Sequence, residues 1–331
     1  MGYKRNECPD CLVNEHFGAY DPDNSKPTTS ELGPIPTPAE IEACTDFIVG
    51  QDRNGPGPIF RRTVPKIVKI GNYVIKFGGR TKFLEAQNLL FLADNCTARV
   101  PKCYGYGYLP GSKEAYIIMN FIEGDMAHVV YPTLDQVDQA EVIRLIGEQI
   151  AIWRSLPDPG YFGALGKKHL PGTYHQTHPD PGGWPNGRLY QGPFDSHDEF
   201  EESMMAHRER HSDPDQRKEA EPTFTLHALC LHECLKGSRS TWTHGDLQPK
   251  NIMIHKNGIN ADGSGIFTVT IFDWETGGWF PEWWEFATNP CFQFGPVEWF
   301  AGALPKIMPV YASAALIWAF WEEFSFPRRT F

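Results

Sequence analysis

The sequence predicts an α+β protein of two lobes, in which a small, mostly antiparallel β half precedes a larger, mainly helical half. Short apolar strand patterns separated by turn residues dominate the first part of the chain, and long helical periodicity dominates the rest. At 331 residues the chain has room for one large domain or two lobes sharing a cleft, and the change of pattern favours two lobes. We expect an extended N-terminal arm over 1–36, a first lobe over 37–121 and a second lobe over 122–331.

A helix signal opens the first lobe. The segment Thr37-Pro-Ala-Glu40 combines an N-cap threonine, a proline in the first turn and a capping-box glutamate, and it predicts a helix to about Val49. Two strands are predicted next, over 66–70 and 73–77. The turn between them begins with a glycine, which suits a type II′ hairpin.

A second helix and a further strand complete the first lobe. Residues 83–93 are apolar nearly all round, and Glu85 shares a helical face with Leu89 and Leu92. The carboxylate of Glu85 is therefore expected to point inward. A short apolar strand follows at 115–119, and it ends where the composition changes.

Helical periodicity marks the second lobe. Thr133 and Gln136 form another capping-box pattern, which predicts the start of a helix that Pro157 ends. The stretch from there to about Ser196 is rich in Pro, Gly and His without a regular period, and it indicates a functional or disordered loop. Two further helices are predicted after it, over 198–211 and 222–236.

Composition argues against several classes of partner. A formal net charge of −11 disfavours binding to nucleic acid or to an anionic membrane surface. The apolar segment 301–320 contains two prolines and Lys306, so it indicates a buried terminal helix rather than a membrane span. Eight cysteines in a chain of this length form no dense disulfide framework, which indicates a cytoplasmic protein with reduced thiols. Oligomeric state is not readable from the sequence.

Two cysteine patterns have ordinary explanations. A CxxC at residues 8–11 has no second pair to complete a zinc site, so an N-terminal turn is favoured. His227, Cys230 and Cys234 share one helical face, and apolar neighbours such as Leu231 indicate core rather than a metal site.

A predicted hairpin in the second lobe carries the chemistry. Strands over 252–254 and 266–272 flank a turn-like segment, and antiparallel pairing would bring the start of the first strand close to the end of the second. Asn251 precedes the first strand and Asp273 comes directly after the second. An amide oxygen beside a carboxylate is a ligand pair suited to Mg²⁺.

Asp246 is the candidate base at the same end of this hairpin. It lies five residues before Asn251, in a loop tight enough to need Gly245. In that position its carboxylate would act near the metal without being a metal ligand.

The segment His244-Gly-Asp-Leu-Gln-Pro-Lys-Asn251, followed by Ile271-Phe-Asp-Trp-Glu275, resembles the aminoglycoside phosphotransferase and choline kinase group of protein-kinase-like enzymes. Fungal proteins assigned to that group by sequence are the most similar, and the resemblance covers most of the chain from about residue 60. It implies a protein-kinase-like bilobal fold. It also implies ATP- and Mg²⁺-dependent phosphoryl transfer to a hydroxyl of a small molecule, such as an aminoglycoside, a choline-like compound or another metabolite.

The resemblance also implies a role for each matching residue. Asp246 would accept or orient the proton of the acceptor hydroxyl, and Asn251 and Asp273 would hold Mg²⁺ ions that bridge the ATP phosphates. Lys76 would contact the phosphates and Glu85 would pair with that lysine, although without the resemblance an exposed lysine on a strand is the favoured interpretation of Lys76. The linker whose backbone pairs with adenine would be Met119, Asn120, Phe121 and Ile122.

Departures from the pattern keep two alternatives open. No GxGxxG precedes the first strands, and the prolines around Gly55 and Gly57 remove amides that would bind phosphate, which leaves a catalytically silent binding module possible. A protein kinase is the other alternative. Gly245 stands where protein kinases carry an arginine, and no APE segment follows Asp273, so this alternative is disfavoured.

The phosphoryl acceptor is not readable. Three carboxylates and three tryptophans are interspersed in the segment that begins just after the metal aspartate: Glu275, Glu282, Glu285, Trp279, Trp283 and Trp284. Together they could hold an amine or a quaternary ammonium group. A packed helix whose tryptophans fill the core is the favoured interpretation.

Overall fold

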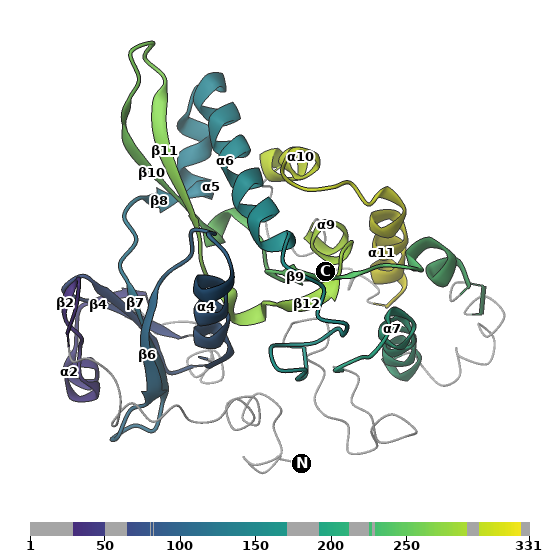
Figure 1. Ribbon diagram of the computed structural model, residues 1–331, viewed down its shortest axis with the longest axis horizontal. Helices are drawn as coiled ribbons and strands as arrows, with labels where there is room; N and C mark the ends of the chain where they lie inside the picture. Colours follow the sequence, from purple (N-terminus) through teal and green to yellow (C-terminus); the bar gives the residue numbers. More distant parts are fainter. Residues whose placement is uncertain are drawn as a thin grey trace, which may run out of the picture. The chain divides into compact units, whose positions relative to one another are not determined.

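The computed structural model describes residues 29–49, 65–79, 81, 83–170, 192–211, 225–226, 229–289 and 298–325 (Figure 1). These residues belong to two compact units, of which the first comprises Met1–Gly124 with Thr270–Glu275 and the second comprises Asp125–Val269 with Thr276–Phe331. The segment Thr270–Glu275 is therefore part of the first unit, although it lies far along the chain.

A five-stranded antiparallel sheet forms the centre of the first unit, with the strand order β3-β4-β5-β7-β6. The strands are β3 (Phe47–Val49), β4 (Lys66–Ile70), β5 (Tyr73–Phe77), β6 (Cys103–Tyr108) and β7 (Ala115–Asn120). A short hairpin of β1 (Thr29–Ser30) and β2 (Gly33–Pro34) and two helices, α2 (Pro38–Ala43) and α4 (Phe83–Asn95), complete it.

Side chains along β5 alternate between the hydrophobic core and the opposite face of the sheet, where Lys76 lies. Ile75 and Phe77 are buried in one hydrophobic cluster together with Ile41 of α2. Because successive side chains of a strand point to opposite faces, Lys76 projects to the other face of the sheet. There it meets Glu85 of α4.

The second unit combines helices with two small antiparallel sheets. Its described helices include α5 (Ala127–Val130), α6 (Gln136–Arg154), α7 (His197–His211), α9 (Trp284–Thr288), α10 (Glu298–Ile307), α11 (Ala312–Ser325) and a helix over 229–235. The 3-10 turns are η2 (Tyr131–Thr133), η3 (Pro249–Asn251) and, at the boundary of the two units, η4 (Trp274–Thr276). One sheet has the order β11-β10-β8 and the other pairs β12 with β9. The strands are β8 (Asp125–Met126), β9 (Ser240–Thr243), β10 (Ile252–Ile259), β11 (Gly265–Ile271) and β12 (Gly278–Pro281).

Aromatic side chains fill the core of the second unit. Phe200 is fully buried, and its ring meets those of Trp283 and Trp284 at centroid distances of 6.4 and 5.4 Å. The ring of Trp318 on α11 lies 5.0 Å from that of Trp284. The preference for core tryptophans over an amine-binding segment is confirmed for Trp279, Trp283 and Trp284, all of which are buried.

Several sequence predictions are confirmed closely. The β4–β5 hairpin has the predicted strands, and Gly71 in its turn has a φ of +58°. The capping box of Thr37 is present, with the Glu40 carboxylate accepting from the Thr37 amide at 2.7 Å. No helix among the described residues has the length and hydrophobicity needed to cross a bilayer.

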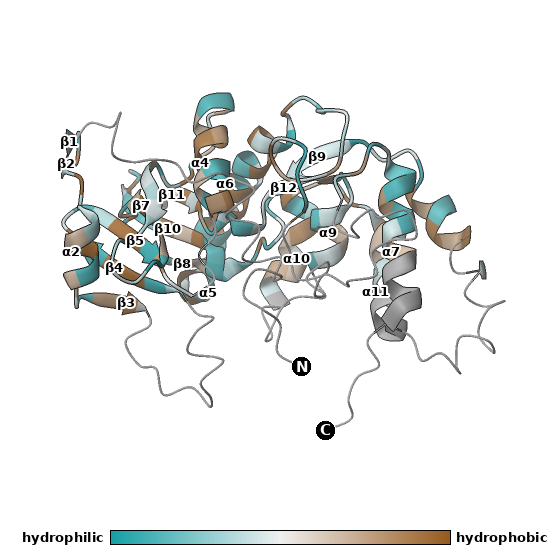
Figure 2. Ribbon diagram, turned by 90° about the horizontal axis from the view of Figure 1, so that it is seen from below, coloured by the Kyte–Doolittle hydropathy of each residue, from teal (hydrophilic) through white to brown (hydrophobic). Residues whose placement is uncertain are grey.

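Other expectations were wrong. The helix that begins after Thr37 ends at Ala43, and the hydrophobic segment after it is strand β3, which pairs with β4 (Figure 2). Asp135, rather than Thr133, caps α6, because its carboxylate accepts from the amides of residues 137 and 138. The expected single terminal helix is two helices, α10 and α11.

The cysteine face was also misjudged. Cys230 and Cys234 are exposed, whereas Leu231 and Leu235 of the same helix are buried. The leucine that directly follows each cysteine therefore faces the core, and the cysteine itself faces away from it. His227 and the CxxC at residues 8–11 lie outside the described residues.

Candidate functional site

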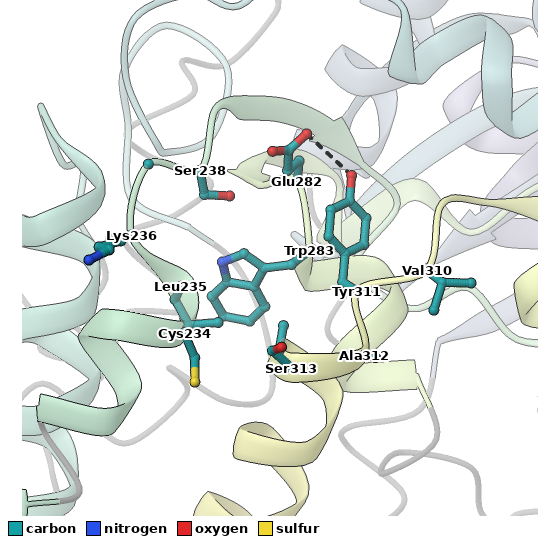
Figure 3. Close-up of a pocket in the computed structure, with 12 residues that line it drawn as sticks. Cys234, Leu235, Lys236, Ser238, Glu282, Trp283, Val310, Tyr311, Ala312 and Ser313 are labelled. Carbon is teal, nitrogen blue, oxygen red and sulfur yellow. Dashed lines mark hydrogen bonds between the residues drawn. The ribbon is translucent and has the colours of Figure 1, made fainter.

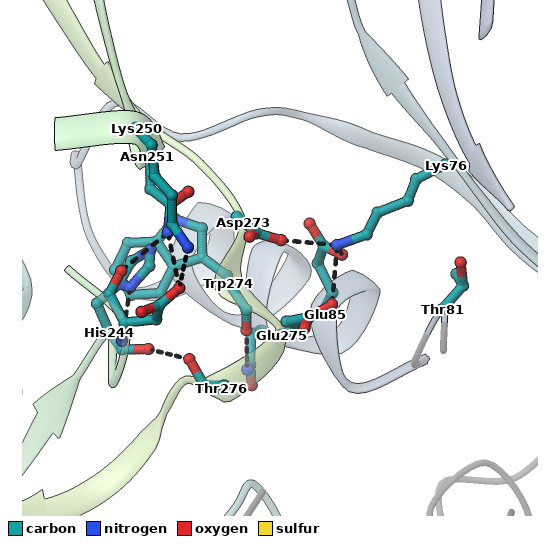
Figure 4. Close-up of polar contacts among 12 residues, drawn as sticks. Lys76, Thr81, Glu85, His244, Lys250, Asn251, Asp273, Trp274, Glu275 and Thr276 are labelled. Carbon is teal, nitrogen blue, oxygen red and sulfur yellow. Dashed lines mark hydrogen bonds and ion pairs between the residues drawn. The ribbon is translucent and has the colours of Figure 1, made fainter. Parts of the chain in front are cut away.

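Lys76 is the centre of a buried charge cluster in the first unit (Figure 4). Its side chain is 7% exposed, and its Nζ lies 2.8 Å from Glu85 Oε2 and 2.6 Å from Asp273 Oδ1. A third carboxylate, that of Glu275, accepts from the same ammonium at 2.9 Å. The sequence interpretation of Lys76 as an exposed strand lysine is therefore wrong, and its pairing with Glu85 is as the resemblance implied.

Local structure explains why two carboxylates from one short segment reach this lysine. Asp273 has a φ of +68°, which turns the chain sharply just after β11. Trp274 between the two acids is fully buried, and its indole N–H donates to the Ile271 carbonyl at 3.0 Å. Its own carbonyl accepts from the Asn88 side chain of α4 at 2.8 Å. Trp274 thus anchors the segment while its neighbours face Lys76.

Among the described residues, the Lys76 ammonium contacts all three carboxylates of this cluster. Burial opposes the charge on Lys76, but attraction by the three carboxylates outweighs it and holds the pKa of Lys76 well above its usual value. Burial raises the pKa of the Glu85 carboxyl to about 7, and Asp273 and Glu275 add to that rise, although Lys76 opposes it. The two shifts are consistent with each other. The nearby carboxylates favour the protonated, charged form of Lys76, whereas burial and the other two carboxylates disfavour the ionised form of Glu85.

A second group of polar residues forms the loop after β9 in the second unit. Gly245 has a φ of +80°, and a Cβ built on it would lie 2.6 Å from the Thr276 carbonyl oxygen. The predicted need for glycine at this position is therefore confirmed on two grounds, backbone conformation and space. The Thr276 hydroxyl in turn donates to the His244 carbonyl at 2.9 Å.

Asp246 follows this glycine and is held from several sides. The side-chain amide nitrogen of Asn251, Nδ2, donates to the Asp246 carbonyl at 2.8 Å and to the Asp246 carboxylate at 3.1 Å. Lys250 Nζ lies 3.3 Å from the same carboxylate, and the Gln248 side chain also donates to it. The side chain of Asp246 is 28% exposed, so it remains accessible to a substrate.

Asn251 and Asp273 each offer an oxygen ligand of the kind that the resemblance assigns to Mg²⁺. Asn251 uses its amide nitrogen toward Asp246, which leaves its amide oxygen, a hard ligand atom, for a cation. The Asp273 side chain is 29% exposed and offers carboxylate oxygens. Asn251 lies directly before β10 and Asp273 shortly after β11, and these strands are hydrogen-bonded neighbours, as the hairpin prediction required.

Glu285 has a positioning role that the sequence did not predict. It is 3% exposed, and its carboxylate accepts from the backbone amides of His244 at 2.7 Å, Gly245 at 3.3 Å and Leu247 at 3.4 Å. Asn289, one turn further along, donates to the Leu247 carbonyl. The Glu285 carboxylate therefore binds the loop rather than an amine. Its signal in the sequence was an acid directly after two tryptophans, since a carboxylate buried with them must find donors inside the protein.

The predicted adenine-binding linker begins inside the sheet. Met119 and Asn120 are the last residues of β7, while Phe121 and Ile122 follow it. The Asn120 amide donates to the Lys102 carbonyl at 3.2 Å, and the Phe121 amide donates to the Asn72 carbonyl at 2.8 Å. A nucleotide could use these two amides only if those bonds opened. Gly55 and Gly57 lie outside the described residues.

A cavity of about 310 Å³ in the second unit is lined by none of these residues (Figure 3). It lies among the end of the helix over 229–235, the end of β12 and the start of α11. The Trp283 ring borders it, and the Tyr311 hydroxyl donates to the Glu282 carboxylate at 3.2 Å beside it. Neither Asp246 nor Asn251 lines it, so this cavity is separate from the predicted catalytic loop.

Aminoglycoside phosphotransferases are among the solved structures similar to this chain. The crystal structure of aminoglycoside phosphotransferase APH(4)-Ia is 12% identical, with a TM-score of 0.45 over 78% of this chain and 80% of that one. The GDP complex of aminoglycoside 2′-phosphotransferase-IIIa is 10% identical, with a TM-score of 0.47 over 79% and 81%. A streptomycin–ATP ternary complex of APH(2″)-IIa is 11% identical, with a TM-score of 0.40 over 77% and 78%.

No curated protein matches the sequence. The sequence profile of the phosphotransferase enzyme family, APH, matches residues 71–294, which is more than half of the chain. That range contains Lys76, Glu85, the loop of Asp246 and Asn251, and Asp273. The predicted protein-kinase-like fold, with an antiparallel β lobe and a helical lobe, is thereby confirmed. The chain belongs to the phosphotransferase enzyme family.

Proposed function

We propose that this protein transfers the γ-phosphoryl group of ATP to a hydroxyl of a small molecule. The observation that carries the proposal is the contact of Lys76 with both Glu85 and Asp273, at 2.8 and 2.6 Å. Asp273 is 197 positions from Lys76 in the chain, so sequence proximity does not explain the contact. Family membership supports the same reaction type.

Asp246 is the proposed catalytic base. Its carboxylate would accept or orient the proton of the acceptor hydroxyl while that oxygen attacks the γ-phosphorus and the bond to the β–γ bridging oxygen breaks. Lys250, at 3.3 Å, and Asn251, at 3.1 Å, fix the direction of this carboxylate. Such transfer depends mainly on positioning and on stabilisation of charge. A carboxylate held in a fixed direction contributes the positioning.

Asn251 and Asp273 are the proposed metal ligands. Bound Mg²⁺ would supply charge neutralisation for the phosphate oxygens. Lys76 would bind the phosphates as a point charge, and Glu85 and Glu275 would hold its ammonium in place. Since Lys76 donates to Asp273 at 2.6 Å, ligation of a cation by Asp273 would exchange this hydrogen bond for a metal contact.

Adenine recognition by the linker at Met119, Asn120, Phe121 and Ile122 remains part of the proposal. The Asn120 and Phe121 amides already donate to backbone carbonyls, so adenine would have to replace these bonds or use other backbone groups of the linker. The acceptor stays at the level of a small hydroxyl compound, such as an aminoglycoside, a choline-like compound or another metabolite. Gly245, in place of an arginine, supports a small molecule over a protein.

The test is ATP turnover with a panel of amines, aminoglycosides and sugars, followed by mass spectrometry of the product. Wild type should phosphorylate at least one acceptor, and Asp246→Asn should lose activity by orders of magnitude. Asp262→Asn is the matched control, since Asp262 lies in the exposed turn of the same β10–β11 hairpin. Equal turnover by wild type and Asp246→Asn would contradict the assignment of the base.

Thermal denaturation with Mg·ATP separates the alternatives. A ligand that binds only the folded state raises the melting temperature, so an unchanged value at millimolar nucleotide would favour a catalytically silent module. Phosphorylation of generic protein substrates that disappears in Asp273→Ala would instead favour a protein kinase.

A further inference from the structure

Three potential metal ligands lie together on α7, and a fourth candidate contacts one of them from the helix over 229–235, within the second unit. His197, Asp198 and Glu201 lie on α7, and their ligand atoms are all within 4.8 Å of one another. The other helix contributes His232, whose Nδ1 lies 2.9 Å from Glu201 Oε2. His197 and Glu201 are four residues apart, which places them on the same face of the helix.

Two of these ligand atoms are buried and lack hydrogen bonds. His197 is 7% exposed and Glu201 is 4% exposed. His197 Nδ1 and Glu201 Oε1 lie 3.0 Å apart, yet their alignment makes no hydrogen bond, and no other described residue supplies one. Buried polar atoms are normally hydrogen-bonded, so a nitrogen and a carboxylate oxygen this close without an aligned bond are suited to share a cation in place of the proton between them.

The spacing suits a single cation. Nitrogen and oxygen ligands at 2.0–2.1 Å from a tetrahedral zinc ion lie about 3.3 Å from each other. His197 Nδ1 lies 3.0 Å from Glu201 Oε1 and His232 Nδ1 lies 2.9 Å from Glu201 Oε2, so each imidazole is close to that distance from one oxygen of the carboxylate. Two neutral imidazoles and two carboxylates carry a charge of −2, which a divalent ion would neutralise.

We propose that His197, Asp198, Glu201 and His232 bind one Zn²⁺ ion. His197 and Glu201 form the buried side of the site. Asp198 is exposed and His232 has a side chain that is 45% exposed, so the ion enters from their side. Imidazole and carboxylate ligands in a four-coordinate arrangement suit zinc.

Bound zinc would link the two helices. Phe200 and Met204 of α7 share one hydrophobic core with Leu231 and Leu235 of the other helix. The ion would add a polar cross-link at the edge of that apolar contact and would stabilise the second unit, because it binds the folded state.

Trp283 gives the site a distinctive signature. Its indole N–H donates to His197 Nε2 at 3.2 Å, and since an indole can only donate, the metal-free ring carries its proton on Nδ1. Zinc at Nδ1 requires the proton to move to Nε2, which removes the acceptor of the indole N–H. Zinc binding therefore competes with the Trp283 hydrogen bond, and Trp283→Phe should bind zinc more tightly than wild type.

The experiment uses the full chain, freed of metal with a chelator and then equilibrated with ZnCl₂. Zinc content after gel filtration should approach one ion per chain, and the melting temperature should rise. Titration with Co²⁺ should give the visible absorption of a four-coordinate ion. Glu201→Gln and His232→Ala should each lose at least tenfold in zinc affinity.

The controls keep the result decisive. His232 is partly exposed, so His232→Ala should fold even where a substitution of buried His197 would not. His128→Ala removes an exposed histidine of α5 elsewhere in the unit and should leave zinc binding unchanged. The proposal is overturned if wild type retains no zinc, if His232→Ala binds as tightly as wild type, or if Trp283→Phe binds no more tightly. None of these results bears on ATP turnover, which is measured separately.

Discussion

Replacing Glu285 with glutamine should disrupt the catalytic loop from a position 41 residues away in the chain. The carboxylate accepts from the amides of His244, Gly245 and Leu247, and it is nearly fully buried. Glutamine has the same size, but one of its two terminal atoms is a donor. That NH₂ group would face backbone N–H groups, so at least one amide would lose its acceptor.

The magnitude follows from the burial of the group. A hydrogen bond to a charged acceptor contributes about 1.5–3 kcal/mol, and a buried donor left unpaired costs about 1–3 kcal/mol. Glu285→Gln should therefore lower the free energy of unfolding by about 3 kcal/mol, a large part of the stability of a typical protein. ATP turnover should also fall, because Asp246 lies among the three amides that Glu285 holds.

Urea denaturation followed by tryptophan fluorescence measures the stability change. Glu282→Gln is the matched control: it makes the same substitution three residues away, where the 28% exposed Glu282 carboxylate accepts from Arg239, whose side chain is 51% exposed, and from the Tyr311 hydroxyl. The amide oxygen of glutamine can still accept from both. Exposed pairs contribute little, so the control should lose less than about 1 kcal/mol. If Glu285→Gln stays within about 1 kcal/mol of wild type, the carboxylate does not organise this loop.

Three further predictions concern other parts of the molecule. Gly245→Ala should lower the unfolding free energy by at least about 2 kcal/mol in urea, because alanine is strained at a φ of +80° and its Cβ would meet the Thr276 carbonyl at 2.6 Å. The pKa of Glu85 is raised by burial from 4.5 to about 7, so the folded state holds its proton more tightly, and stability should decline as pH rises from 4.5 to 7. The unfolding free energy of Glu85→Gln should not show this decline with pH. If the unfolding free energies of wild type and Glu85→Gln change with pH in the same way, the raised pKa of Glu85 is contradicted. Thr37→Ala should destabilise α2 by about 1 kcal/mol through loss of the N-cap, measured by local hydrogen exchange.

The sequence alone determined the elements whose signals are local. The β4–β5 hairpin follows from alternation and a glycine in its turn, and the β10–β11 hairpin with Asn251 and Asp273 near its open ends follows from two short strands around a turn. The inward direction of Glu85 follows from its helical face. The requirement for Gly245 follows from the tightness of the loop between β9 and Asp246. Each of these conclusions depends on residues within about twenty positions of each other.

Competition between local signals explains the errors. The capping box at Thr37 predicts where α2 begins, but the hydrophobic residues after Ala43 pair with β4 instead of extending the helix. Near α6 the predicted cap Thr133 is wrong, because the Asp135 carboxylate accepts from the first amides of the helix. At α2 the decision therefore came from a partner strand elsewhere in the chain, and at α6 it was made by a neighbouring residue.

Only the tertiary structure decided which groups meet. The contact of Glu275 with Lys76, the three amides held by Glu285, and the approach of His232 to Glu201 join residues that no helical or strand period relates. A carboxylate in the sequence shows that a charge is present, but its partner depends on which segments pack together. Burial then decides the energy, because a charge removed from water must be satisfied by whatever donors the fold brings to it.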